Sequence, residues 1–190
     1  MIVLEQILIV SSAEKSVASL SSLIGRNSKI SAVSNGGEAR RLLSSREFDI
    51  VIVNAPLSDE FGYDLAIWVS EISFSGILML VKAEQADMIW DRVCDHGISV
   101  LGKPLSRKLF LGTLRTIRAY RNRLMKLQKK NKLLITQLDT FKVVSRAKLL
   151  LMEQMKMSEN QAHSYIEKQA MDLRVSKREI AEGILKTYEN

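Results

Sequence analysis

Apolar residues in the first hundred positions form short clusters separated by polar and glycine-containing stretches. Five clusters are rich in β-branched residues and have lengths typical of buried strands. We predict strands at 6–10, 29–33, 49–53, 77–81 and 99–101. Apolar positions between them recur at helical spacing, which predicts helices near 13–24, 36–46, 63–72 and 84–95, and a fifth starting near Ser106. Alternating strands and helices predict an α/β flavodoxin-like domain with a five-stranded parallel sheet of order 2-1-3-4-5.

The pattern changes near residue 113, where two series of mostly apolar residues repeat every seven positions without Gly or Pro. Position a of the heptad holds Ile117, Leu124, Asn131 and Leu138, and position d holds Tyr120, Leu127, Leu134 and Phe141. This spacing predicts the seam of a coiled-coil homodimer, and the alternative is a lone amphipathic helix packed on its own domain. An Asn at an a position favours a parallel dimer. The e and g positions offer no attractive charge pair, so the coil needs help from the first domain or from a bound polyanion.

The last segment carries two signals for the start of a helix. Ser158 precedes Gln161 by three positions, and Ser176 precedes Glu179 in the same way, which is the spacing of a capping box. With the apolar positions before Ser158, they predict a three-helix unit of about forty residues, too small to enclose an enzyme pocket. We therefore expect three regions: a domain at 1–112, a coiled-coil helix at 113–145 and a small binding module at 146–190.

Charge is distributed unevenly along the chain. Residues 1–106 have a net charge of −4, whereas residues 107–190 have a net charge of +11, and the stretch 107–132 holds ten Lys or Arg and no acid. Such asymmetry favours a polyanionic partner for the second half. A solvated helix face is the alternative for the basic stretch alone.

Three stretches of the last segment resemble the ANTAR domain, the RNA-binding output module of bacterial transcription antiterminators. They are RAKLLLM (146–152), SENQAHSYIEKQAM (158–171) and REIAEGIL (178–185). Leu149 departs from the family, which usually has Gly there, and Glu167 stands where Arg is common. The resemblance implies an antitermination regulator that binds paired hairpins of a leader transcript.

RNA contacts require Lys and Arg for phosphates and an aromatic ring for stacking on exposed bases. The candidates are Arg146, Lys148, Arg174, Lys177, Arg178, Lys186 and Tyr188. Each of these charged residues can equally be a solvated surface residue, and Tyr188 can instead cover the small core.

The stretches FDIVIVNAPLSDEFGYDL (48–65) and GKPLS (102–106) resemble a response-regulator receiver. That family has a phosphoacceptor Asp after the third strand, two Mg²⁺-binding acids after the first, a Ser or Thr after the fourth and Lys-Pro after the fifth. Here Asn54, the pair Ser11 and Ser12, and Lys82 replace the first three, and only Lys103 with Pro104 remains. An amide is a poor nucleophile and hydroxyls hold Mg²⁺ weakly. We therefore predict a pseudo-receiver with a degenerate phosphorylation pocket, in which the two lysines are either solvated or bind an anion.

Other classes of protein receive little support. A single Cys suits a reducing cytoplasm, no apolar run is long enough to span a bilayer, and no residues have metal-ligand spacing. We expect no catalytic residues and no cofactor. Two alternatives stay open: a DNA-binding response regulator, and a protein-interaction adaptor that uses Met152, Met155 and Met157. The sequence does not name the input signal, for which a sequestering or sensor protein is one possibility.

Overall fold

The computed structural model describes residues 5–25 and 28–188, and the other residues of the predicted first and last regions lie outside this description. The chain divides into two compact units, residues 1–126 and 127–190, and each is described by itself. The strands are β1 (Glu5–Val10), β2 (Ser28–Val33), β3 (Ile50–Asn54), β4 (Gly76–Lys82) and β5 (Ser99–Lys103). The helices are α1 (Glu14–Ile24), α2 (Gly36–Ser45), α3 (Tyr63–Ile72), α4 (Ala86–Val93), α5 (Arg107–Gln154), α6 (Glu159–Leu173) and α7 (Lys177–Tyr188), with 3-10 turns η1 (Ala83–Gln85) and η2 (Cys94–His96).

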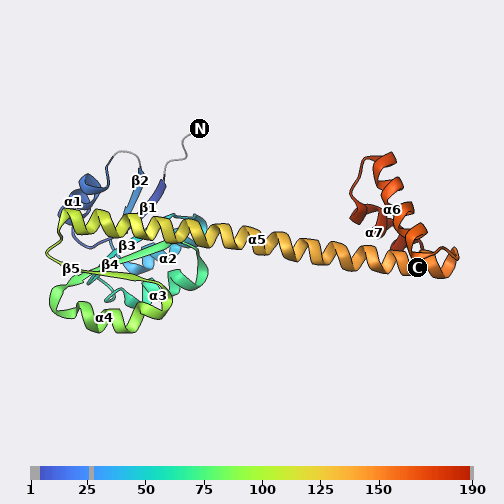
Figure 1. The fold of residues 1–190 in the computed structure, drawn as a ribbon. Coiled ribbons are helices and arrows are strands. Elements are labelled where there is room, and N and C mark those ends of the chain that lie inside the picture. The colour runs from blue at the N-terminus through green and yellow to red at the C-terminus, as the bar shows by residue number, and fades with distance from the viewer. Residues whose placement is uncertain (1–4, 26–27, 189–190) are drawn as a thin grey trace. The chain divides into compact units, whose positions relative to one another are not determined.

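The strands form one parallel sheet of order β2-β1-β3-β4-β5 (Figure 1). The predicted fold class and strand order are therefore confirmed. Every residue of β3 is buried, as expected for the central strand of a sheet covered on both faces, and its β-branched side chains suit that position.

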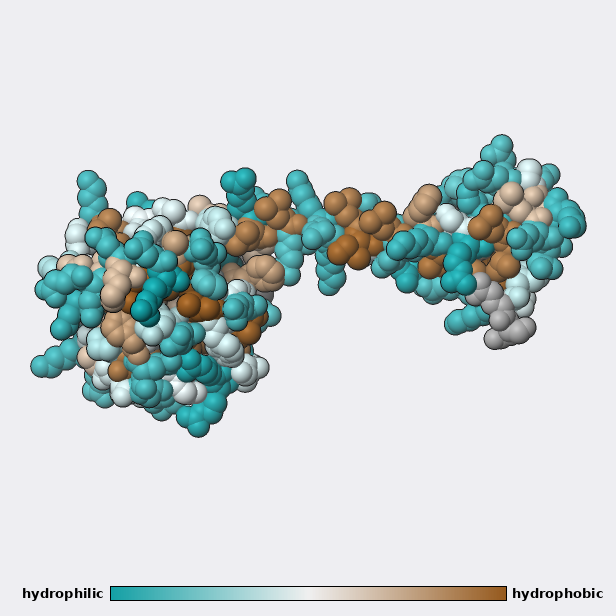
Figure 2. Space-filling view, turned by 90° about the horizontal axis from the view of Figure 1, so that it is seen from below, coloured by the Kyte–Doolittle hydropathy of each residue, from teal (hydrophilic) through white to brown (hydrophobic). Residues whose placement is uncertain are grey.

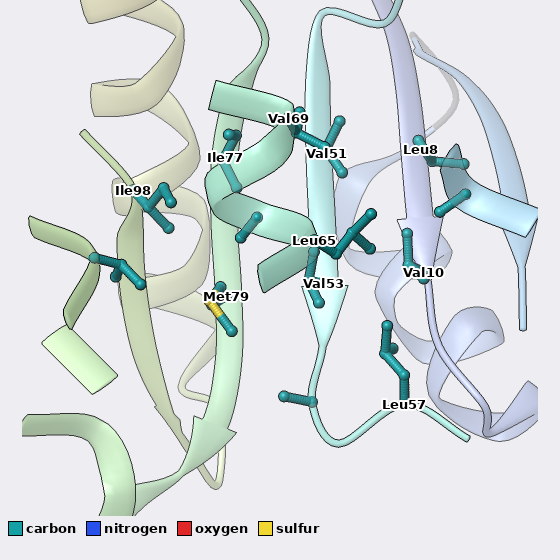
Figure 3. Packing of buried hydrophobic residues seen from close by; sticks show 14 of the residues in the cluster. Leu8, Val10, Val51, Val53, Leu57, Leu65, Val69, Ile77, Met79 and Ile98 are labelled. Carbon is teal, nitrogen blue, oxygen red and sulfur yellow. The ribbon is translucent and has the colours of Figure 1, made fainter. Parts of the chain in front are cut away.

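Helices cover both faces of the sheet. Leu8, Val51 and Met79 face the side covered by α2, α3 and α4, where they pack with Leu65 and Val69 (Figure 3). Alternate strand residues point the other way, toward α1 and the first turns of α5. The alternation follows from the two-residue period of a strand, and it divides the core into two layers.

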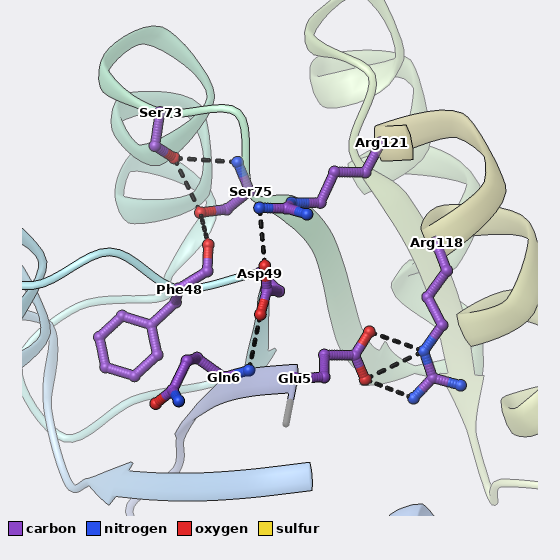
Figure 4. Close-up of polar contacts among 8 residues, drawn as sticks. All are labelled: Glu5, Gln6, Phe48, Asp49, Ser73, Ser75, Arg118 and Arg121. Carbon is purple, nitrogen blue, oxygen red and sulfur yellow. Dashed lines mark hydrogen bonds and ion pairs between the residues drawn. The ribbon is translucent and has the colours of Figure 1, made fainter. Parts of the chain in front are cut away.

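The beginning of α5 is fixed to the sheet by apolar and ionic contacts. Phe110, Leu114 and Ile117 are buried in the second layer. Beside them, Arg118 forms an ion pair with Glu5 at 2.6 Å, and Arg121 forms one with Asp49 at 2.7 Å (Figure 4). The first part of α5, from Arg107 to Arg121, therefore belongs to the receiver-like unit.

This arrangement corrects one predicted seam residue. Ile117 was assigned to the dimer seam, but it is only 6% exposed and packs within its own domain. A helix that covers a sheet and a helix in a coiled coil both place apolar residues three and four positions apart, so the first turns satisfied both patterns.

The second unit is built from the end of α5 with α6 and α7. Its core consists of Ala147, Leu151, Ala162, Ile166 and Ala181, and the small alanines allow the helices to approach closely. Both predicted capping boxes are present: Ser158 with Gln161 at the start of α6, and Ser176 with Glu179 at the start of α7. Met152 and Met157 pack against this core, which removes two of the three methionines proposed for an adaptor surface.

The predicted region boundaries at residues 112 and 145 both fall inside α5, which runs unbroken from Arg107 to Gln154. They stay predictions, because a continuous helix marks neither boundary. No helix in the described parts of the chain is long and apolar enough to cross a membrane.

The packing of Ile117 can be tested at Gly76. A Cβ added at Gly76 would lie 2.1 Å from Ile117 Cγ2, so Gly76→Ala should lower the free energy of unfolding by about 1–3 kcal/mol. In an Ile117→Ala background the same substitution should cost less, because the clashing methyl group is gone. Urea denaturation followed by tryptophan fluorescence measures this unit alone, since Trp68 and Trp90 both lie in it.

Gly112→Ala is the matched control. Nothing lies within 4 Å of a Cβ at this exposed position of α5, and Ala favours a helix over Gly by about 1 kcal/mol. The control should therefore be neutral or stabilising. An equal cost of Gly76→Ala with and without Ile117 would contradict the packing described here.

Candidate functional site

The carboxyl ends of four strands bring together most of the predicted phosphorylation pocket. Asn54 Nδ2 donates a hydrogen bond to Ser11 Oγ at 2.9 Å, and both residues are buried. Lys103 Nζ donates to Asn54 Oδ1 at 3.1 Å and to the Ala55 carbonyl at 2.7 Å. Ser11, Asn54 and Lys103 thus form one hydrogen-bonded chain in which the Asn54 amide is used on both sides.

The two other predicted pocket residues remain outside this chain. Ser12 and Lys82 are exposed. Burial of Lys103, and secondly the nearby charge of Lys82, lower the pKa of Lys103 below its ordinary value. The proximity of two like charges fits the predicted positive pocket, although Lys103 is already satisfied by neutral acceptors.

The acids of the loop after β3 are engaged elsewhere. Asp59 accepts hydrogen bonds from the N–H groups of Gly36 and Gly37 at the start of α2, and these lower its pKa. Glu60 pairs with Arg40 through two hydrogen bonds of 2.6 and 3.0 Å. Over the described residues no cluster of three or more His, Cys, Asp or Glu could hold a metal ion. A hydroxyl and an amide in the pocket therefore do not fit the Mg²⁺ that a receiver uses.

The predicted dimer seam divides into two parts along α5. Tyr120 and Leu124, with the half-exposed rings of Phe74 and Trp90, line a hollow of about 660 Å³ in the first unit, beside the amino ends of β4 and β5. The later positions lie on the surface: the seam residues Leu127, Asn131, Leu134, Leu138 and Phe141 are all exposed. Figure 2 shows hydrophobic side chains along this middle part of α5. An exposed apolar stripe of this length is the feature that a helical partner would cover.

Among the predicted RNA contacts, Lys148, Lys177 and Arg178 form ion pairs within the small unit. Lys148 lies 2.6 Å from Glu159, Lys177 donates to Glu167, and Arg178 lies 2.7 Å from Glu182. The acids in these pairs were not among the predicted site residues. The sequence contained part of the signal, because Glu159 and Glu167 lie eight positions apart on one helix, but the partners come from other helices.

The other four predicted contacts are exposed residues of the unit. Arg146 lies on α5, and Lys186 and Tyr188 lie on the last turn of α7. Arg174 ends α6 in the left-handed conformation, at φ 55° and ψ 39°. Glycine is the usual residue at such a position because other residues are strained there. Arg174, Lys177 and Arg178 all lie at the turn that joins α6 to α7.

Comparison with known proteins identifies the two parts. The model of the ANTAR domain matches residues 133–185. This match begins within the region predicted as the coil. Transcriptional regulatory protein PdtaR of Mycobacterium tuberculosis is 29% identical over 154 residues, which cover 80% of this chain and 75% of PdtaR.

Solved structures resemble the first part. The receiver domain of an HD domain-containing protein from Pseudomonas fluorescens Pf-5 has a TM-score of 0.59 and 23% identity, over 64% of this chain and 92% of that one. Chemotaxis response regulator CheY4 of Vibrio cholerae has a TM-score of 0.54 and 20% identity, over 60% and 99% of the two chains. These likenesses show a receiver fold.

The pocket chemistry predicts that acetyl phosphate with Mg²⁺ will not phosphorylate the first unit. Asn54 has no carboxylate to attack phosphorus, and neither Ser11 nor Ser12 supplies a charged metal ligand. Mass spectrometry of the intact protein, and of its peptides, should show no added phosphoryl group. A receiver that keeps the three acids is the positive control. A phosphoryl group on any peptide of residues 5–126 would overturn the prediction.

Proposed function

We propose that this chain is an ANTAR-domain response regulator that binds hairpins of a nascent leader transcript and regulates transcription by antitermination. The observation that carries the proposal is the match of the ANTAR domain to the unit that holds the basic turn between α6 and α7. Lys and Arg provide salt-dependent phosphate contacts, and the loop bases of a hairpin are available for stacking and hydrogen bonding.

The consequence for transcription follows from competition between RNA structures. A hairpin held by the protein cannot refold into the terminator that uses the same nucleotides, so RNA polymerase reads through. The chain would do this in the cytoplasm as a binding regulator rather than as an enzyme, and two hairpins would be bound together.

A parallel homodimer would provide the two RNA-binding units. The exposed stripe from Leu127 to Phe141 is the proposed seam, and Asn131 would fix its register. Basic residues beside the seam, such as Arg123 and Lys130, would give each helix a positive charge that opposes association of two copies. Bound RNA would screen this repulsion, so dimer formation and RNA binding would strengthen each other.

The receiver-like unit would act without phosphorylation. Its pocket holds an amide in place of a carboxylate nucleophile, and Lys103 already donates to two neutral acceptors. A sensor or sequestering protein that binds this unit would supply the input that phosphate supplies in other receivers.

The RNA proposal is tested by selection from a pool of two-hairpin RNAs with randomised loops at physiological salt. The full-length protein should enrich particular loops. A selected RNA should then bind more tightly than the same RNA with scrambled loops, because sequence-independent phosphate contacts are equal in the two. Duplex DNA of equal length is the second control. Equal affinity for all three nucleic acids would refute RNA recognition.

The dimer is tested by Leu134→Lys, which buries two charges in the proposed seam. Sedimentation should show a shift toward monomer relative to the wild type, and preference for two hairpins over one should fall, because the second binding event is no longer intramolecular. Lys130→Gln is the matched change at a flanking position and should leave the dimer intact or strengthen it. Identical sedimentation of the wild type and Leu134→Lys, both with a two-hairpin RNA bound, would exclude this seam.

Substitution of Arg174 by glycine should change stability and RNA binding in opposite directions. Arg174→Gly should raise the free energy of unfolding by about 1 kcal/mol, because glycine tolerates the left-handed conformation. The same substitution should weaken RNA binding about three- to tenfold through loss of a phosphate contact. Arg174→Lys keeps the charge and is the control. Circular dichroism and RNA titration measure the two effects, and undiminished RNA binding by Arg174→Gly would remove Arg174 from the interface.

A further inference from the structure

One side of α6 carries a row of ionisable residues four positions apart: Glu159, His163 and Glu167. Each acid at an end of the row holds a lysine from another helix. Lys148 of α5 pairs with Glu159, and Lys177 at the start of α7 donates to Glu167. His163 Nε2 lies 3.3 Å from the same Glu167 oxygen. Two predicted RNA contacts are thereby tied to one helix.

The two pairs differ in how accessible the lysine is. The Lys148 side chain is 18% exposed, whereas its partner Glu159 is 69% exposed. The Lys148 side chain is therefore mostly covered by the protein, and its ion pair with Glu159 links α5 to α6. The Lys177 side chain is 48% exposed and Glu167 is 40% exposed. A phosphate from solution can approach Lys177, where it competes with the Glu167 carboxylate for the ammonium group.

The charge state of Glu167 supports this competition. The hydrogen bond from Lys177, then its charge and that of His163, lower the pKa of Glu167 below the ordinary glutamate value. The carboxylate is thus anionic under the conditions in which RNA would bind. It both occupies the Lys177 ammonium and repels a phosphate that comes near.

We propose that Glu167 withholds Lys177 from RNA phosphates and so limits the sequence-independent part of RNA affinity. This inference rests on the proposed RNA binding and adds the residue that restrains it. Phosphate contacts raise affinity for every RNA alike, whereas base contacts distinguish one loop from another. A weaker phosphate contribution leaves less of the protein bound to unrelated RNA, which is far more abundant than any one target.

The test compares Glu167→Gln with Glu153→Gln. Glu153 is an exposed acid of the same unit that has no ion pair among residues 28–188, so its substitution reports the effect of removing any negative charge. Glu167→Gln should bind selected and loop-scrambled RNA about three- to tenfold more tightly than Glu153→Gln does. The slope of log affinity against log salt should steepen by about 0.7–0.9, the value for one added phosphate contact.

The role of Lys177 is tested by repeating the comparison in a Lys177→Gln background. There the gain from Glu167→Gln should fall to that of Glu153→Gln, because no ammonium is left to release. Loss of a purely structural contact between α6 and α7 would weaken binding rather than strengthen it.

The inference fails if Glu167→Gln and Glu153→Gln bind equally, or if the full gain persists without Lys177. These failures are distinct from failure of the proposed function. If the wild type binds RNA with selected loops and RNA with scrambled loops equally, the proposed RNA recognition is refuted, independently of the result for Glu167→Gln. If the wild type does distinguish them, only the restraint by Glu167 is in question.

Discussion

The burial of Phe110, Leu114 and Ile117 against the sheet fixes the position of α5 on the receiver-like unit. Each such side chain contributes about 1.5–3 kcal/mol when it is removed from water, and the ion pairs of Arg118 and Arg121 orient the same turns. Helix α5 then continues past Leu127, where its apolar side chains are exposed. Two arginines of the basic stretch, Arg118 and Arg121, form these ion pairs with acids of their own unit and so contribute less to binding a polyanion.

The phosphorylation pocket and the ANTAR unit handle polar groups in opposite ways. In the pocket, Ser11, Asn54 and Lys103 are joined by hydrogen bonds, and the acceptors of the Lys103 ammonium carry no charge. In the ANTAR unit, the lysines at positions 148 and 177 are matched by anionic partners near the surface. Buried groups must be paired because water is absent, whereas exposed ion pairs contribute little and can be exchanged for another anion. A fixed pocket and an exchangeable basic surface are consistent with a regulator whose output is binding.

The strands, the helices and the pocket were predictable because each depends on local pattern. β-branched runs define the strands, and parallel strands bring Asn54 and Lys103 to one edge of the sheet. The placement of Ile117 was not predictable, since seven-residue spacing describes both a seam and a helix on a sheet. The pairing of Lys177 with Glu167 depends on how α7 packs on α6, and no spacing within one helix encodes it. The left-handed conformation of Arg174 was also not predictable, because glycine usually occupies such a position and here the residue is arginine.

Helix α5 is continuous from Arg107 to Gln154, so the exposed apolar residues between Leu127 and Phe141 lie on unbroken helix. Each residue of an α-helix turns by about 100°. Deleting one residue between Leu127 and Leu134 would turn Leu134, Leu138 and Phe141 away from the side defined by Leu127, whereas inserting seven residues there would nearly preserve it. The length of this segment can therefore change during evolution only in steps of about seven residues if the stripe is to survive.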